Sequence, residues 1–221
     1  MASKNSTLKT PSGKSWKKAK ELLEAGNERF RDLAGPGSDS GPRSFNRCER
    51  VESDEPAWPW NKEKQFPWAV IVTCADSRIT PEAVFDTSVG ELFVIRVAGN
   101  IANVETVASV EYAVNALNPA PKLVVVLGHE NCGAVAAARS GEHYGFNLNT
   151  LLAPIKLAID IGKSRSLSGA VKDNVEHTVR ELEYRVRDIP DRRAPMKGIK
   201  ILPAYYHLES GKVEFLETKD T

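Results

Sequence analysis

The sequence has no apolar run that approaches the roughly 18 to 20 residues needed to cross a bilayer. We therefore expect no membrane-spanning segment. It also lacks an excess of one charge, because 30 lysines and arginines against 29 aspartates and glutamates give a formal net charge of +1. This balance provides no general attraction to nucleic acid or to an anionic membrane surface, and it favours a small-molecule or protein partner.

Cysteine is scarce, with three in 221 residues. An odd number in a chain of this size does not suggest a disulfide framework, so we expect a reducing, cytoplasmic setting. The first 20 residues are polar and charged, without the apolar stretch of a secretory signal peptide. The cysteines therefore need another explanation.

The composition, 41% hydrophobic and 27% charged, is that of a globular protein. We divide the chain into a flexible N-terminal tail at 1–15, a helix and long surface loop at 16–66, and an α/β domain at 67–221. Apolar residues recur at helical spacing from Trp16 to Leu33, which predicts an amphipathic helical arm. Because this stripe has no obvious partner within one compact domain, we expect it to pack on a neighbouring subunit.

The body of the chain alternates between strand and helix patterns. Short, continuous runs rich in valine and isoleucine predict strands buried on both faces, at 68–72, 92–97 and 123–127. The apolar spacing at 104–117 predicts a helix between the last two, with Asn103 as its N-cap. Strand, helix and strand with short connections indicate a parallel sheet with right-handed crossovers.

The C-terminal third continues this pattern. Two amphipathic helices are expected near 148–163 and 170–188, and two strands joined by a turn at 199–207 and 212–216. The fold class is therefore α/β: a single domain with a mostly parallel central β-sheet flanked by helices, plus the N-terminal helical arm.

Residues that carry chemistry gather where the predicted strands end, which is where parallel α/β sheets bind ligands. The first strand runs into Cys74, and the third runs into His129 and Cys132. The last two are three positions apart, so a turn or first helical coil puts both side chains on one side. Two cysteines, one histidine and an open position form a catalytic zinc set, whereas structural zinc sites have four protein ligands. The alternative is a pair of buried core thiols beside a core histidine.

Asp76 lies two residues after Cys74, and Arg78 two residues further on. The carboxylate could bind a metal directly and close the site, or accept a hydrogen bond from the water on the metal. Arg78 offers a bidentate partner that would hold Asp76 off the metal and ionised. The alternative is an ordinary surface ion pair, which contributes little to stability.

The sequence Cys-Ala-Asp-Ser-Arg at 74–78, followed by Gly-His-Glu-Asn-Cys-Gly at 128–133, resembles the motifs of the β-class carbonic anhydrases. Further blocks between about 65 and 138 resemble this family in its order: Ile79–Glu82, Gly90–Val94, Arg96–Asn100 and Ser109–Ala113. The resemblance implies a zinc lyase (a carbonate dehydratase). Its reaction would be the reversible hydration of carbon dioxide to bicarbonate and a proton, by attack of zinc-bound hydroxide.

The resemblance also implies roles for individual residues. One zinc ion per chain would be held by Cys74, His129 and Cys132, with Asp76 and Arg78 as the catalytic pair beside it. Four residues fall on positions that line the family's substrate pocket: Gln65, Phe93, Tyr112 and Gly133. Because the family builds this pocket across a dimer interface, we expect a homodimer or a higher homo-oligomer with the active site at that interface.

One departure from part of the family is informative. A subset carries Trp-x-Gly just before the first zinc cysteine, which marks an inhibitory bicarbonate site with the aspartate on the metal. This chain has Ile71-Val72-Thr73 there. The resemblance therefore implies the constitutively open subset, in which Asp76 pairs with Arg78.

Three other functions remain as alternatives. A relative of the same fold could act on carbonyl sulfide or carbon disulfide, although such enzymes depart from the Cys-x-Asp-Ser-Arg pattern. A thiol hydrolase could use Cys132 with His129, but it would leave Cys74 idle and lacks the glycine pattern of a nucleophile elbow. A non-catalytic zinc module would use Asp76 as a permanent fourth ligand.

Overall fold

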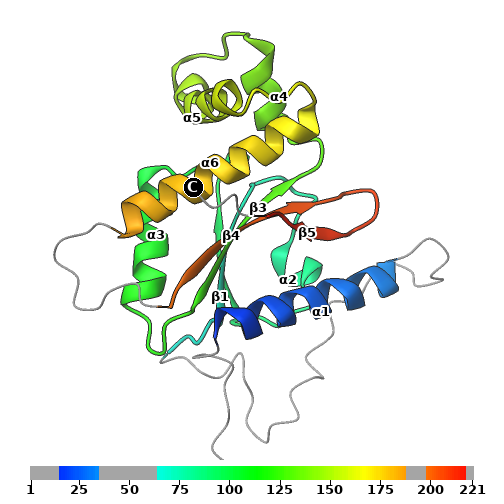
Figure 1. Ribbon diagram of the computed structural model, residues 1–221, viewed down its shortest axis with the longest axis vertical. Helices are drawn as coiled ribbons and strands as arrows, with labels where there is room; N and C mark the ends of the chain where they lie inside the picture. The colour runs from blue at the N-terminus through cyan, green and yellow to red at the C-terminus, as the bar shows by residue number, and fades with distance from the viewer. Residues whose placement is uncertain (1–14, 35–63, 188–197, 218–221) are drawn as a thin grey trace, which may run out of the picture.

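The computed structural model of the chain describes residues 15–34, 64–187 and 198–217 (Figure 1). Nearly all of the expected tail, and the expected surface loop from residue 35 to residue 63, lie outside the described residues. No helix in the described part is both long and apolar enough to span a membrane.

A five-stranded sheet in the order β2-β1-β3-β4-β5 forms the centre of the molecule (Figure 1). Its strands are β1 (Ala69–Thr73), β2 (Leu92–Arg96), β3 (Leu123–His129), β4 (Lys200–Tyr206) and β5 (Val213–Phe215). The first four are parallel, and β5 pairs antiparallel with β4. Every residue of β1 and β3 is buried, as continuous apolar runs require. The predicted α/β fold and its strands are confirmed, with ends that differ by two residues at most.

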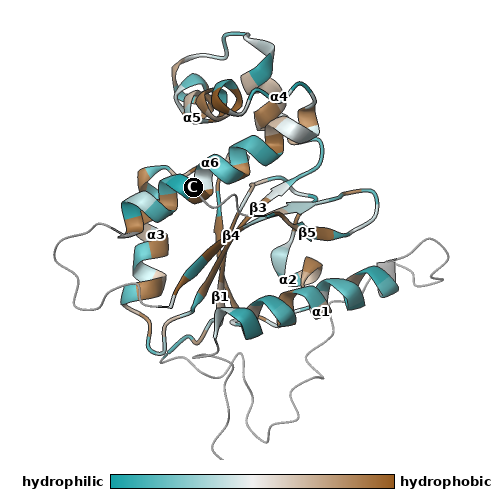
Figure 2. Ribbon diagram, viewed as in Figure 1, coloured by the Kyte–Doolittle hydropathy of each residue, from teal (hydrophilic) through white to brown (hydrophobic). Residues whose placement is uncertain are grey.

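Helices cover both faces of the sheet (Figure 1). On one face lie α3 (Val104–Asn115) and α6 (Leu167–Arg187), and on the other α1 (Trp16–Ala34) and the short α2 (Pro81–Val84). Beyond the carboxyl end of β3, α4 (Gly133–Ser140) and α5 (Phe146–Gly162) pack on each other and on α6. Figure 2 shows apolar residues concentrated in the strands and hydrophilic residues along the outer sides of α1 and α6.

Local sequence accounts for most of these helices. The side chain of Asn103 accepts a hydrogen bond from the Thr106 N–H and caps α3, as predicted. The predicted apolar stripe of α6 is buried: Val171, Val175, Val179, Leu182 and Val186. The sequence did not predict α4, because this alanine-rich helix carries only one large apolar residue, Val135, and so shows no clear helical period.

The predicted N-terminal helix is confirmed as α1, and its apolar stripe does have a partner within the same chain, contrary to the reason for expecting it to pack on a neighbouring subunit. Ala19 and Leu23 are fully buried in the chain's own core. The side chain of Asn27 donates to the carbonyl oxygens of Val84 (3.1 Å) and Gly211 (2.9 Å) and accepts from the Val213 N–H (2.8 Å). The partners of α1 were missed because they come from α2 and from the β4–β5 hairpin, far along the chain.

Candidate metal centre

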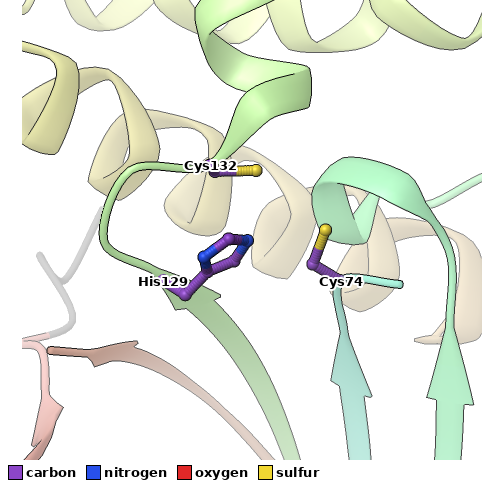
Figure 3. A group of neighbouring side chains, drawn as sticks. All are labelled: Cys74, His129 and Cys132. Atoms are coloured by element: carbon purple, nitrogen blue, oxygen red, sulfur yellow. The ribbon is translucent and has the colours of Figure 1, made fainter. Parts of the chain in front are cut away.

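Three side chains converge at the carboxyl ends of two neighbouring strands (Figure 3). Cys74 follows β1, His129 is the last residue of β3, and Cys132 is the N-cap of α4. Because β1 and β3 are paired in parallel, their carboxyl ends lie at the same edge of the sheet. One ligand atom from each residue lies within 4.8 Å of the others, and the side chains point toward one another. The structure therefore brings together the three residues expected to be metal ligands.

The chemistry of this cluster fits a zinc ion. Cys74, His129 and Cys132 are exposed by only 4%, 0% and 1%. His129 Nδ1 lies 2.9 Å from the Glu130 carbonyl oxygen, which can only accept, so this nitrogen carries the proton. The other ring nitrogen, Nε2, then presents a lone pair and has no hydrogen-bond partner among the described residues. An unpaired buried nitrogen beside two sulfurs is a donor set that zinc satisfies.

The two thiols form a hydrogen-bonded pair. The contact with Cys132 lowers the pKa of the Cys74 thiol to about 4, and the same contact raises the pKa of Cys132. Physically, the second proton is hard to remove because two thiolates would then lie side by side in a buried place. A divalent cation between the sulfurs removes this repulsion and takes the place of the proton.

Backbone and side-chain contacts from β2 and the turn that follows it hold Cys74 in place. Arg96, the last residue of β2, donates through Nε to the Cys74 carbonyl (3.1 Å) and through Nη2 to the Asp76 carbonyl (2.7 Å). The Gly99 N–H donates to Cys74 Sγ at 3.3 Å. Arg96 and Gly99 stood inside a family-like block in the sequence, but nothing in the local pattern pointed to these contacts.

The expected ion pair between Asp76 and Arg78, beside the three candidate ligands, is present. Asp76 Oδ1 accepts from Arg78 Nε (2.9 Å) and from the Arg78 backbone N–H (2.9 Å), while Oδ2 accepts from Nη2 (2.7 Å). These hydrogen bonds hold the pKa of the Asp76 carboxyl well below its usual range and raise the pKa of Arg78. Asp76 Oδ2 also lies 3.9 Å from His129 Nε2. The ionised carboxylate of Asp76 therefore lies next to the three candidate ligands, while its own oxygens accept hydrogen bonds from Arg78.

The four residues expected to line a substrate pocket are partly brought together. The rings of Phe93 on β2 and Tyr112 on α3 lie 6.2 Å apart between centroids. Gly133, the first residue of α4, is exposed directly beside Cys132. Gln65 is exposed in the segment before β1 and makes no hydrogen bond within the described part of the chain. In a single chain, Gln65, Tyr112 and Gly133 are therefore open to solvent.

Comparison with known proteins places this site in a family. The family model described as carbonic anhydrase matches residues 69–213. A carbonic anhydrase from Mycolicibacterium smegmatis is 35% identical over 159 residues, which cover 69% of this chain and 76% of the relative. Carbonic anhydrase 2 from Mycobacterium tuberculosis is 36% identical over 155 residues, 67% of this chain and 73% of the relative.

Solved structures agree with this assignment. The β-carbonic anhydrase CafA of Aspergillus fumigatus superposes with a TM-score of 0.60 at 25% identity, over 71% of this chain and 78% of that one. The Coccomyxa β-carbonic anhydrase in complex with acetazolamide gives a TM-score of 0.55 at 27% identity, over 69% of this chain and 72% of that one. The chain therefore belongs to the β-class carbonic anhydrases, zinc-dependent enzymes that interconvert carbon dioxide and bicarbonate.

Proposed function

We propose that Cys74, His129 and Cys132 hold one zinc ion per chain and that carbon dioxide is hydrated at this ion. The observation that carries the proposal is the convergence of three buried ligand atoms within 4.8 Å, one of them a nitrogen with no hydrogen-bond partner in the part of the chain that the structure describes. When bound, zinc lowers the pKa of a water molecule from about 15.7 to about 7 and so supplies a nucleophile near neutral pH.

Asp76 is proposed to orient the reacting water by accepting a hydrogen bond from it. Arg78 keeps this carboxylate ionised, and the two bonds from its guanidinium hold both carboxylate oxygens. The same bonds keep Asp76 from becoming a fourth metal ligand, so one position stays open for chemistry. This geometry supports the constitutively open form and argues against a non-catalytic zinc module.

The active site is further proposed to lie at the interface of a homodimer or higher homo-oligomer. Among the described strands, β2 is an edge strand whose outer side pairs with none of the others, so a second chain could approach it there. Phe93 stands on this edge strand and contacts Tyr112, whose side chain is 51% exposed. A partner along β2 would cover both rings and could complete a pocket with Gln65 and Gly133. The β-carbonic anhydrases of Sordaria macrospora, which share this fold, are tetrameric.

A cytoplasmic location and the three-part division of the chain complete the proposal. Cys74 and Cys132 are free thiols, which a reducing compartment preserves. The family model spans residues 69–213, which supports a catalytic domain at 67–221 preceded by the tail at 1–15 and the helix and loop at 16–66.

Stopped-flow measurement of carbon dioxide hydration by the zinc-loaded chain tests this function. We expect rapid turnover that Cys74→Ser abolishes together with zinc binding, whereas Cys48→Ser, which removes the third thiol of the sequence, changes neither. Zinc bound at one per chain without turnover would refute the reaction and direct attention to carbonyl sulfide or carbon disulfide. A wild-type chain that binds no zinc would refute the metal site itself.

A further inference from the structure

We propose that Asn174, on α6, is a positioning residue for the Cys74 ligand, because it fixes Gly99 where the Gly99 N–H donates to the sulfur. This inference rests on the proposed metal site and adds to it a residue from a helix that contributes none of the three ligands. Asn174 neither touches the reacting atoms nor belongs to any of the motifs at the strand ends.

Two hydrogen bonds link Asn174 to the metal ligand. Its side-chain Nδ2 donates to the Gly99 carbonyl oxygen at 2.8 Å, and the Gly99 N–H donates to Cys74 Sγ at 3.3 Å. Both bonds are buried, and Asn174 itself is 1% exposed. Gly99 is thus held at its carbonyl by α6 while its N–H faces the sulfur. Movement of the carbonyl would move the N–H with it.

Gly99 needs such an anchor because of its own backbone. It lies within the short 3-10 turn η1 (Ala98–Asn100) with a φ of 73°, a left-handed conformation that glycine tolerates best. A Cβ at this position would lie 2.4 Å from Ile155 Cδ1 and 3.3 Å from the Ala134 Cβ, so any other residue would strain the backbone and displace the Ile155 side chain. Glycine has the widest backbone freedom of all residues, and a contact from outside must therefore fix the direction of its N–H.

A second glycine lets α6 come close enough to provide this contact. A Cβ at Gly128 would lie 2.4 Å from Val175 Cγ2 and 3.0 Å from Val171 Cγ1. The helix therefore packs directly on β3, one residue before His129. Asn174 lies between these two valines in the sequence and is buried like them, so the close packing of α6 on β3 holds its amide within reach of the Gly99 carbonyl.

The side-chain oxygen of Asn174, which is unfavourable for stability, also indicates a specific role. Its Oδ1 is buried and has no hydrogen-bond partner among the described residues. A leucine at this buried helical position would avoid the unpaired oxygen. What leucine cannot provide is the N–H that reaches Gly99. Outer contacts of this kind typically change metal affinity about 10- to 100-fold when they are removed.

The test compares Asn174→Leu with Thr178→Val in the full-length chain. Thr178 is the matched control, because it lies one turn further along α6, is also 1% exposed and borders the same cavity of about 280 Å³ as Asn174. Zinc affinity is measured by competition with a chelator, and the thiolate-to-metal charge-transfer absorption is recorded after loading with Co²⁺. Thermal unfolding of each metal-free variant reports separately on stability, and Asn174→Ala replaces the leucine variant if that one does not fold.

We expect Asn174→Leu to weaken zinc binding about 10-fold or more and to shift the cobalt charge-transfer band. Thr178→Val should leave both unchanged even if its melting temperature falls. An Asn174 variant that is less stable but keeps wild-type zinc affinity and an unshifted band would overturn the inference and leave a purely structural residue. A wild-type chain that takes up neither metal would instead overturn the proposed site on which the inference rests.

Discussion

Two buried asparagines on opposite faces of the sheet show how differently the same side chain is used. Asn27 of α1 is 4% exposed and satisfies both ends of its amide, with two donated hydrogen bonds and one accepted. Asn174 of α6 is 1% exposed, makes one hydrogen bond, to Gly99, and leaves its oxygen unpaired. The fully satisfied amide of Asn27 joins α1 to α2 and to the β4–β5 hairpin and so stabilises the fold. The incompletely satisfied amide of Asn174 binds Gly99, whose N–H donates to the proposed metal ligand Cys74, and there we propose that it positions the sulfur at some cost in stability.

The largest effect is expected at the fully satisfied amide of Asn27. Asn27→Ala would leave the Val84 and Gly211 carbonyls and the Val213 N–H without their partner. We expect a loss of about 3 kcal/mol in the free energy of unfolding, measured with urea, because buried unpaired groups each cost about 1–3 kcal/mol. Zinc affinity per folded chain should stay unchanged. The control is Glu28→Ala, which changes the exposed residue next to Asn27. If Asn27→Ala changed the zinc affinity, the contrast between the two asparagines would not hold.

A smaller effect on stability, but a large one on turnover, is expected at the ion pair. The Arg78 side chain is 51% exposed, so Arg78→Ala should hardly change the melting temperature. It would release Asp76 toward the metal, and we expect kcat/KM to fall about 10- to 100-fold. Stopped-flow assays and thermal unfolding measure the two quantities. If the melting temperature fell sharply together with kcat/KM, the ion pair would be structural. Arg139→Ala, which removes an exposed arginine of α4, serves as the control.

The backbone next to Asn27 sharpens the comparison further. Alanine normally stabilises a helix by about 1 kcal/mol relative to glycine. At Gly26, however, a Cβ would lie 1.9 Å from the Phe85 carbonyl oxygen. Gly26→Ala should therefore destabilise the fold by about 1–2 kcal/mol, because α1 must move away from α2. Urea unfolding checks the sign, and a more stable variant would show that this helix is not held tightly against its own chain.

The smallest effect concerns pH. Lys172 of α6 and then His207 bind Glu214 of β5, and these contacts lower the pKa of the Glu214 carboxyl below its ordinary value of 4.5. Their stabilising effect is therefore present above pH 4.5 and is lost as the pH falls through the lowered value. Because this carboxyl is 40% exposed, Glu214→Gln should cost only a few tenths of a kcal/mol at pH 7. The difference from wild type should shrink as the pH falls below 4.5, and urea unfolding at a series of pH values measures it.

Much of the fold and the three candidate metal ligands could be predicted, because the sequence patterns that indicate them are local. Continuous apolar runs mark β1 and β3, and the positions of Cys74 and His129 follow directly from where these strands end. The contacts that support the cluster could not be predicted, since a hydrogen bond from Arg96 or Asn174 to a distant backbone carbonyl leaves no periodic pattern. One signal did exist: Asn174, like Thr178, is a polar residue on the mostly apolar, buried side of α6.

The close approach of the three ligand atoms has a consequence for the stability of the whole chain. Because folding of the sheet already places these atoms within 4.8 Å of one another, the proposed zinc ion would bind the folded chain more tightly than the unfolded one. By mass action, a ligand at 100 times its Kd then adds about 2.7 kcal/mol to the free energy of unfolding. This amount is close to the loss expected for Asn27→Ala. Zinc in the buffer would therefore conceal damage on the far face of the sheet, and stripping the metal would reveal it.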